Sequence, residues 1–409
     1  MLAPKLRFKE FNDEWDYKLF NEIFEFIKNN SFSRDMLNYD ENSKIYNIHY
    51  GDILTKYGEI IDFNIISNII PKINNDISLS KFEDKSYLKN GDIIIADTAE
   101  DLTVGKSCEV INLHCKALAG LHTIPCRPKF KFASQYLGEY INSTSYHSQL
   151  IPYITGIKVS SISKTSIIKT KIYFPTVKEQ EKISELFSLL NKKIELQQRK
   201  IEVLKMYKRG LSNKLFNQKA NYMFKECFLH MGGTALEKYV NSTGKYKFIS
   251  IGNYSSDGTY VDNNQRIDNI ATTTDKILDK DNLVMVLNDK TSQGNIIGST
   301  ILIDKDDLYI YNQRSERIIC NNKIIPLYAW CILNSPNVRA TIFKKSQGGT
   351  QIYINFSEIE KLKLYIPNIK EQDKLSQIYI SIVKKIDLEI AYFDNLKLLK
   401  KSLLQQMFI

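Results

Sequence analysis

Asp76, Glu83 and Lys85 are the residues of this 409-residue chain whose types most suggest catalysis. Carboxylates near a lysine are typical of metal-dependent nucleases, because carboxylate oxygens hold the divalent cation. Triples of this composition are also common by chance, and Glu83 and Lys85 are tightly spaced. A self-contained, metal-dependent nuclease is therefore one hypothesis for the function, to be weighed against the rest of the sequence.

A second group of residues has the types that ligate zinc. Cysteine and histidine cluster within nineteen positions, at Cys108, His114, Cys115, His122 and Cys126. Structural zinc sites pair their ligands two to four positions apart, and here only His122 and Cys126 approach that spacing. The six cysteines include no Cys-x-x-Cys pair, so we expect free thiols rather than a metal site.

Other catalytic motifs are incomplete or missing. Asn334-Ser-Pro-Asn337 lacks the second proline and the aromatic residue of the tetrad with which amino-methyltransferases hold a flipped base. No glycine-rich loop for S-adenosylmethionine precedes it, and the sequence has neither a Walker loop nor a His-Glu-x-x-His motif. We therefore expect that the chain catalyses no reaction by itself.

The composition is that of a globular protein of two to three domains, with 43% hydrophobic and 25% charged residues. No run reaches the ~18 apolar residues of a membrane span, and the first residues form no secretory signal. These features predict a soluble, cytoplasmic protein with no membrane partner. Lysine and arginine number 56 against 46 aspartates and glutamates, and this net charge of +10 suits a polyanionic partner.

The strongest pattern in the sequence is an internal repeat. Residues 171–216 and 363–408 align without a gap at an offset of 192 positions, and 17 of the 46 aligned residues are identical. Weaker matches at the same offset lie upstream, such as Asn142 with Asn334. The chain is therefore two copies of one plan, in which a variable globular part is followed by a well-kept tail.

Each tail is predicted to be one long helix. Both tails open with a proline and then a capping-box spacing, Thr176 with Glu179 and Asn368 with Glu371. Heptad positions a and d are mostly apolar in both tails, which favours an antiparallel coiled coil over two helices packed on globular cores. The predicted seam comprises Leu190, Ile194, Gln197, Ile201, Leu204, Lys208, Leu211 and Leu215 of the first helix and Ile382, Ile386, Glu389, Phe393, Leu396, Lys400, Leu403 and Met407 of the second.

The polar seam residues select a register for this pair. Setting Gln197 opposite Lys400 and Lys208 opposite Glu389 gives facing residue numbers that sum to 597 and pairs every polar seam residue. A shift of one heptad, to a sum of 590, places Lys400 against Leu190 and is the alternative. An unpaired buried polar group costs about 1–3 kcal/mol, which favours the first register.

The globular parts contain short β-rich runs, such as 92–96 and 282–287, between helical stretches. The predicted class is therefore α/β, with two tandem mixed α/β domains, each followed by a long helix, and internal pseudo-two-fold symmetry. The predicted bounds are 1–177 for the first domain, 178–217 for its helix, 218–369 for the second domain and 370–409 for its helix. The symmetry also predicts equivalent surroundings for Phe216 and Phe408.

This organisation resembles the specificity (S) subunit of Type I restriction–modification enzymes, over the whole chain. The residues that carry the likeness are Pro175, Glu179, Gln180 and Phe216, their counterparts Pro367, Glu371, Gln372 and Phe408, and the opening from Pro4 to Phe8 with Trp15. The helix motif is fairly specific, whereas the variable domains carry no motif of their own.

The resemblance implies a non-catalytic subunit with two target recognition domains, each reading one half of a bipartite, asymmetric sequence in double-stranded DNA. The helices would form a spacer and dock two methyltransferase (M) subunits, and restriction (R) subunits would join the full complex. S-adenosylmethionine, Mg²⁺ and ATP would belong to those partners, and this chain would hold no cofactor or metal. A self-contained nuclease and a coiled-coil scaffold without a DNA role remain as alternatives.

We expect DNA contacts from polar and basic residues of both copies. Gln313 and Arg314 suit adenine and guanine edges, and His122 is the first-copy counterpart of Arg314. A polar loop before the last strand of each domain is expected to approach phosphate, unless it is only a surface turn. These loops contribute Thr155, Gly156 and Lys158 in the first copy and Gln347, Gly348, Gly349 and Thr350 in the second, and Lys106, Lys290, Lys344 and Lys345 are further expected phosphate contacts.

Overall fold

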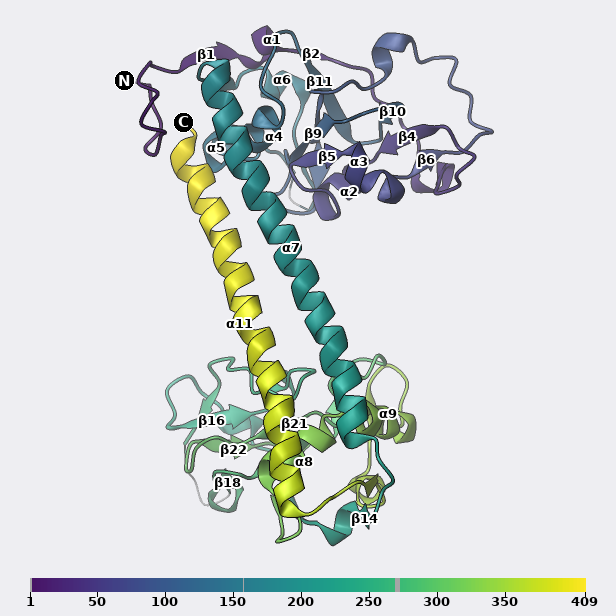
Figure 1. Ribbon diagram of the computed structural model, residues 1–409, viewed down its shortest axis with the longest axis vertical. Helices are drawn as coiled ribbons and strands as arrows, with labels where there is room; N and C mark the ends of the chain where they lie inside the picture. The colour runs from purple at the N-terminus through teal and green to yellow at the C-terminus, as the bar shows by residue number, and fades with distance from the viewer. Residues whose placement is uncertain (1, 157, 269–272) are drawn as a thin grey trace. The chain divides into compact units, whose positions relative to one another are not determined.

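The structure is a computed structural model that describes residues 2–156, 158–268 and 273–409 (Figure 1). It divides into unit 1, residues 1–197 with 392–409, and unit 2, residues 198–391. Each unit holds one mixed α/β domain and part of both long helices, α7 (Val177–Phe216) and α11 (Ile369–Met407). In the part of the chain described, no helix has the length and apolar character needed to cross a membrane.

The first domain is built on two sheets of short strands. The larger has the order β2 (Phe24–Phe26), β11 (Thr123–Pro128), β7 (Ile93–Ala96), β9 (Ser107–Ile111) and β5 (Ile60–Asp62). The smaller has the order β10 (Lys116–Ala119), β4 (Ile45–Ile48), β6 (Lys72–Ile73) and β3 (Leu37–Asn38). The helices of the domain are α1 (Phe20–Ile23), α2 (Tyr50–Thr55), α3 (Phe63–Ile66), α4 (Tyr136–Ile141), α5 (Thr144–Leu150) and α6 (Lys164–Ile167). Every residue of β7 and β9 is buried, so these two strands lie at the centre of the core.

The second domain repeats this plan. One sheet has the order β15 (Phe228–Gly232), β23 (Ser315–Cys320), β19 (Leu283–Val286) and β21 (Thr300–Leu302). The other has the order β17 (Arg266–Ile267), β16 (Tyr246–Ile249), β22 (Tyr309–Tyr311) and β18 (Ile277–Leu278). The helices are α8 (Pro326–Leu333), α9 (Pro336–Lys345) and α10 (Phe356–Ile359). The parallel pairing of β16 with β22 matches that of β4 with β10, so the duplication extends to the domain topology.

Two small antiparallel ribbons recur in each domain. Next to the long helices, β1 (Asp16–Leu19) pairs with β13 (Lys171–Phe174), and β14 (Tyr222–Met223) pairs with β25 (Lys363–Leu364). The other ribbons join β8 (Thr98–Ala99) to β12 (Ser160–Ser161) and β20 (Asn288–Asp289) to β24 (Ile352–Tyr353). Short 3₁₀ turns lie at Arg34–Met36, Ser67–Ile69, Asp84–Ser86, Ile151–Tyr153, Phe224–Glu226, Glu237–Tyr239, Ile251–Asn253 and Thr274–Lys276.

The Glu-Gln motif at the start of each long helix anchors that helix to its own domain. The side-chain oxygen of Gln180 accepts a hydrogen bond from the backbone N–H of Ala133 (3.0 Å), and that of Gln372 accepts one from Ile325 (2.9 Å). In both cases the side-chain amide nitrogen donates to the carbonyl of the proline that opens the motif. Both glutamines are buried, so the motif fixes the start of the helix against the domain before it.

Phe216 and Phe408 have equivalent surroundings, as the repeat predicted. The two side chains are 5% and 3% exposed. The ring of Phe216 meets that of Tyr328 edge-on at 5.6 Å, and the ring of Phe408 meets that of Tyr136, the counterpart of Tyr328, at 5.8 Å. The prediction of equivalent, buried helix ends is confirmed.

The predicted register of the two long helices is wrong. Glu389 forms an ion pair with Lys200 at 2.7 Å rather than with Lys208, so these facing residue numbers sum to 589, close to the alternative of 590. Lys208 and Lys400 each pair instead with carboxylates of a globular domain. The penalty for leaving Lys400 opposite an apolar residue therefore does not arise, and the argument for a sum of 597 fails.

The residues of the predicted seam are all buried or half-buried. The buried ones are Leu190, Gln197, Ile201, Ile382, Ile386, Leu396 and Met407. The half-buried ones are Ile194, Leu204, Lys208, Leu211, Leu215, Glu389, Phe393, Lys400 and Leu403. By contrast, Leu196, Met206 and Leu388 lie outside the seam and are 55%, 74% and 72% exposed.

Candidate nucleic-acid interface

Three loops of the first domain that are far apart in the sequence come together. The N–H of Asp97 donates to the carbonyl of His122 (3.1 Å), and the adjacent strand β8 pairs with β12. Thr155 and Ser161 of β12 exchange backbone hydrogen bonds of 3.0 and 2.8 Å. We call residues 97–99, 120–122, 155–156 and 158–161 the first loop cluster. Ile157, inside the predicted loop, lies outside the described residues.

The second domain builds the same three connections. The N–H of Leu287 donates to the carbonyl of Arg314 (2.9 Å), and the adjacent strand β20 pairs with β24. Gln347 and Tyr353 of β24 exchange two backbone hydrogen bonds of 2.8 Å. We call residues 287–290, 312–314 and 347–353 the second loop cluster. Residues that the sequence placed far apart, from Lys290 to Thr350, thus belong to one surface.

The side chains of the two clusters have the chemistry that reads base edges. His122, Gln313 and Arg314 are exposed, and each can donate a hydrogen bond outward. Gln313 is also steadied by a hydrogen bond from its amide nitrogen to Glu237 (3.3 Å). Arginine and glutamine are the residue types that form paired hydrogen bonds with guanine and adenine in the major groove. The remaining predicted loop residues Thr155, Gly156, Lys158, Gln347, Gly348, Gly349 and Thr350 are also exposed.

The glycines of the two loops are required by the turns themselves. Gly156 and Gly348 both have φ of +108°, a conformation that side chains disfavour. A Cβ at Gly156 would lie 1.9 Å from the carbonyl oxygen of Val159, and one at Gly348 would lie 2.1 Å from that of Gln351. The same tight turn therefore accounts for both glycines, and their presence is no sign of close approach by phosphate.

His122 is held by groups that sequence reasoning missed. Its Nδ1 lies 3.3 Å from a carboxylate oxygen of Asp97 and 3.4 Å from the hydroxyl of Thr98, and its ring meets Tyr50 edge-on at 5.2 Å. Tyr50 also contacts His49, and burial lowers the pKa of His49 to about 4, so that ring is neutral. His49 and Tyr50 directly follow strand β4, and Asp97 and Thr98 directly follow strand β7. Polar residues placed directly after buried strands are the sequence signal that could have identified this group.

The predicted phosphate contacts divide into engaged and exposed lysines. Lys106 is half-buried, and its ammonium donates to the carbonyls of Leu54 (3.2 Å) and Tyr57 (2.9 Å), so it closes the end of α2, and its contact with phosphate stays a prediction. Lys345 forms an ion pair with Glu358 at 2.5 Å. The exposed residues, which form no ion pair within the described ranges, are Lys158, Lys290 and Lys344.

The residues that suggested metal chemistry form no metal-binding group within the described ranges. Glu83 and Lys85 make an exposed ion pair of 2.9 Å with each other, and hydrogen bonding to Lys85 lowers the pKa of Glu83. Cys108 and Cys126 are buried free thiols whose pKa values burial raises. No group of three histidine, cysteine, aspartate or glutamate side chains that could hold a metal ion occurs among the residues described here.

Asn334, which suggested a methyltransferase motif, has a structural role. Its side chain accepts a hydrogen bond from the N–H of Thr300 (3.0 Å) and donates to the carbonyl of the same residue (2.8 Å). Asn142, its counterpart in the repeat, makes the same pair of bonds with Ser107 (3.0 and 2.9 Å). In each domain the asparagine after a helix therefore clamps a strand of the central sheet.

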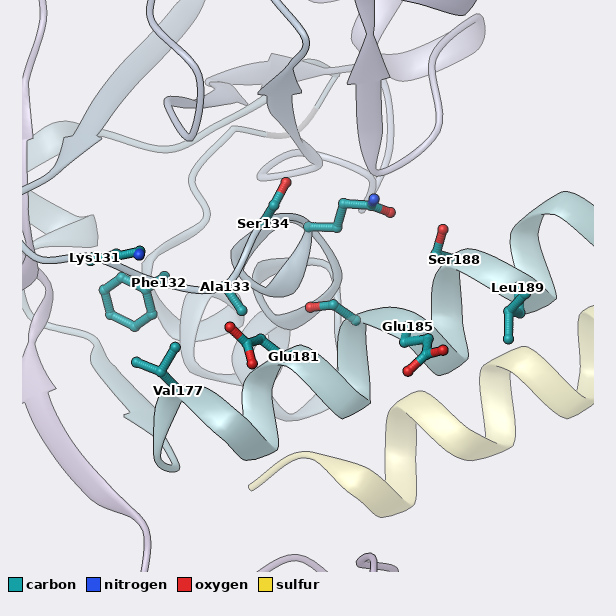
Figure 2. A pocket seen from close by; sticks show the side chains of 11 residues that line it. Lys131, Phe132, Ala133, Ser134, Val177, Glu181, Glu185, Ser188 and Leu189 are labelled. Carbon is teal, nitrogen blue, oxygen red and sulfur yellow. The ribbon is translucent and has the colours of Figure 1, made fainter.

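A cavity of about 530 Å³ lies beside the start of α7 in unit 1 (Figure 2). Glu181 and Glu185 line it from the helix, and the loop 131–135 lines its other side (Figure 2). It shares no residue with the first loop cluster. Its two carboxylates disfavour phosphate, so we do not assign it to nucleic acid.

The two domains share their topology, and each presents the same loop cluster. Residues 12–206 and 224–393 match the Type I restriction modification DNA specificity domain, which covers most of the chain. The chain belongs to this family, and the resemblance found in the sequence is confirmed.

Individual relatives are distant. A protein described as a type I restriction enzyme specificity subunit, MjaX of Methanocaldococcus jannaschii, is 24% identical over 220 residues, which are 52% of this chain. The match covers 48% of that protein, so the chain spans about half the length of this curated relative.

Two solved structures share the fold over nearly the full length. The Type-I restriction–modification system S subunit from M. genitalium has 14% identity and a TM-score of 0.56, with 100% of this chain and 99% of that chain covered. A chain from a study of complex assembly and conformational transition in the type I R-M system has 12% identity and a TM-score of 0.63, with 95% and 96% covered. At these identities the likeness shows the fold alone.

Proposed function

We propose that this chain is the DNA-recognition subunit of a Type I restriction–modification complex and reads a bipartite, asymmetric sequence in double-stranded DNA. The observation that carries the proposal is the loop cluster, built once in each domain by the same three backbone connections. Each cluster reads one half-site. Arg314 and Gln313 supply the base-edge contacts of one half and His122 those of the other.

We further propose that α7 and α11 form an antiparallel coiled coil that acts as the spacer between the two half-site readers. Contacts between the helices support this pairing, since Glu389 meets Lys200 and the ring of Phe187 meets Phe408 at 5.8 Å. A helix of 40 residues is about 60 Å long, longer than one ~34 Å turn of DNA. Sequence between the half-sites would therefore go unread.

Internal symmetry of this kind provides two equivalent docking positions, which fits two methyltransferase subunits, with restriction subunits completing the complex. S-adenosylmethionine, Mg²⁺ and ATP would serve those partners. The chain itself directs their activity by holding them at the recognised sequence and performs no chemical step. This scheme assigns no role to Glu83 and Asp76. A self-contained nuclease, by contrast, would need these carboxylates to hold its metal ion.

A domain exchange tests the proposal. Residues 1–170 are replaced by the counterpart of another family member, and the hybrid is copurified with its methyltransferase subunits. Methylated sites in genomic DNA are then mapped. We expect one half-site of the target to change and the other to stay. A change in both half-sites, for every donor that yields a folded hybrid, would contradict the assignment of one reader to each domain.

A further inference from the structure

Unit 2 contains a cavity of about 810 Å³ whose charged lining residues are mainly positive. Lys205, Lys208 and Arg209 project into its lining from α7, and Arg339 contributes from α9. The one carboxylate in the lining is Asp257, which is 3.0 Å from the ammonium of Lys208. Four cations against one anion leave the cavity with a net charge of about +3.

Arg339 is a structural part of this site and not a flexible surface cation. Its guanidinium donates to the backbone carbonyls of Ile297 (2.9 Å), Asn295 (2.9 Å) and Ser256 (3.2 Å), which fixes the loops around the cavity. It bonds no carboxylate of the described residues, although Asp257 and Asp289 are near enough to act on its charge, and burial lowers its pKa to about 10. A half-buried cation whose hydrogen-bond partners are neutral carbonyls favours an anion beside it.

The two outer cations are available to such an anion. Lys205 and Arg209 are exposed and one helical turn apart, so their side chains lie on the same face of α7. Neither forms an ion pair with any residue that the structure describes. We propose that this cavity binds a phosphate group, through Lys205 and Arg209 at its mouth and Arg339 at its wall.

The first unit provides an internal comparison. In the repeat, Lys397, Lys400 and Lys401 are the counterparts of Lys205, Lys208 and Arg209. There, however, Lys400 lies between two carboxylates, those of Glu59 (2.7 Å) and Glu139 (3.3 Å). His147 replaces Arg339 and bonds the carbonyl of Val104 (3.0 Å). The same helical positions thus carry cations in both units, but those of unit 2 border a cavity with a half-buried arginine that hydrogen-bonds to backbone carbonyls.

The test compares two double variants of the full chain, Lys205→Ala with Arg209→Ala, and Lys397→Ala with Lys401→Ala as the matched control. Binding of pyrophosphate is measured by calorimetry, and binding of an arbitrary 20-base-pair duplex is measured from about 50 to 200 mM salt. We expect the first variant to weaken pyrophosphate binding at least about tenfold and the control to leave it within about twofold. All four side chains are exposed, so we expect both variants to fold, and circular dichroism checks this.

The two probes also separate the sources of the phosphate. A loss of pyrophosphate binding with an unchanged duplex assigns the cavity to a free phosphate compound. For the duplex, the slope of log binding constant against log salt concentration should fall in magnitude by about 0.9 for each lost phosphate contact. Such a fall in the first variant alone assigns the cavity to the DNA backbone. Equal responses of the two double variants to both probes, or no response in either, would overturn the proposal. Because the duplex is of arbitrary sequence, these results are independent of whether the chain reads a bipartite target.

Discussion

Replacing Lys400 by methionine should destabilise unit 1 far more than the matched change at Lys208 destabilises unit 2. The ammonium of Lys400 lies 2.7 Å from Glu59 and 3.3 Å from Glu139, and the side chains of Lys400 and Glu139 are 11% and 2% exposed. Removing one partner of a buried ion pair costs about 3–5 kcal/mol, because the other charge stays buried. Asp257, the partner of Lys208, is 65% exposed, so its loss costs at most about 1 kcal/mol.

The size of this effect should depend on pH. Burial raises the pKa of Glu139 to about 7, while Lys400 opposes that rise and Glu59 adds to it. The folded state therefore binds a proton that the unfolded state, with an ordinary pKa of 4.5, releases, and Glu139 makes the free energy of unfolding fall as pH rises from about 4.5 to about 7. Without Lys400 the carboxylate is harder to ionise, so this window extends upward. Lys400→Met should cost more at pH 8 than at pH 5.5.

The two tryptophans of the chain let each unit be followed separately. Trp15 is buried in unit 1 and Trp330 in unit 2. In a Trp330→Phe background, urea unfolding followed by Trp15 fluorescence should show a midpoint lower by about 1–2 M for Lys400→Met, for a denaturant slope of about 2–3 kcal/mol per M. In a Trp15→Phe background, Lys208→Met should shift the midpoint by less than about 0.5 M. Equal small shifts for the two lysines would refute the reasoning.

Three further outcomes are expected. Phe216→Ala and Phe408→Ala should each cost about 3–5 kcal/mol of unfolding free energy in their own unit, measured by the same fluorescence, and a difference above about 2 kcal/mol would contradict equivalent helix ends. Gly348→Ala should lower the thermal midpoint of unit 2 by several degrees, because the added Cβ meets a backbone carbonyl. Gly349→Ala should leave the midpoint unchanged, because nothing lies within 4 Å of its Cβ position. Equal midpoints for the two variants would contradict a rigid turn at Gly348. Purified chain incubated with Mg²⁺ should leave DNA intact, and cleavage that Glu83→Ala abolishes would reject a non-catalytic role.

The sequence was sufficient wherever a residue's surroundings follow from a local or repeated pattern. Heptad spacing placed the seam residues on faces that are buried or half-buried, and the repeat located Phe216 and Phe408 in matching pockets. The repeat also pointed to Asn334 with Asn142, although their shared function as strand clamps emerged only from the structure. Equivalent positions can be paired from sequence, but their hydrogen-bond partners cannot.

Long-range partners were the part that the sequence could not supply. Glu59 lies 341 positions before Lys400, and no periodicity relates them, so the predicted register paired Lys400 with the facing helix. The prediction of a phosphate contact for Lys106 rests on its charge alone. The carbonyls that its ammonium bonds lie 49 and 52 positions away and cannot be inferred from the sequence. The loops that hold Gly156 and Gly348 are predicted from sequence to approach phosphate, but the tight turn that requires a glycine in each of them emerges only from the structure.

The central claim, two half-site readers on one chain, is tested most directly by selecting bound sequences from random duplexes with the chain copurified with its methyltransferase subunits. We expect two short half-sites separated by unread positions. Arg314→Ala should relax one base pair in one half-site by about 1–3 kcal/mol, which is roughly 5- to 150-fold, and His122→Ala should act only on the other. A single uninterrupted motif, or loss of selectivity in the same half-site for both variants, would contradict the account.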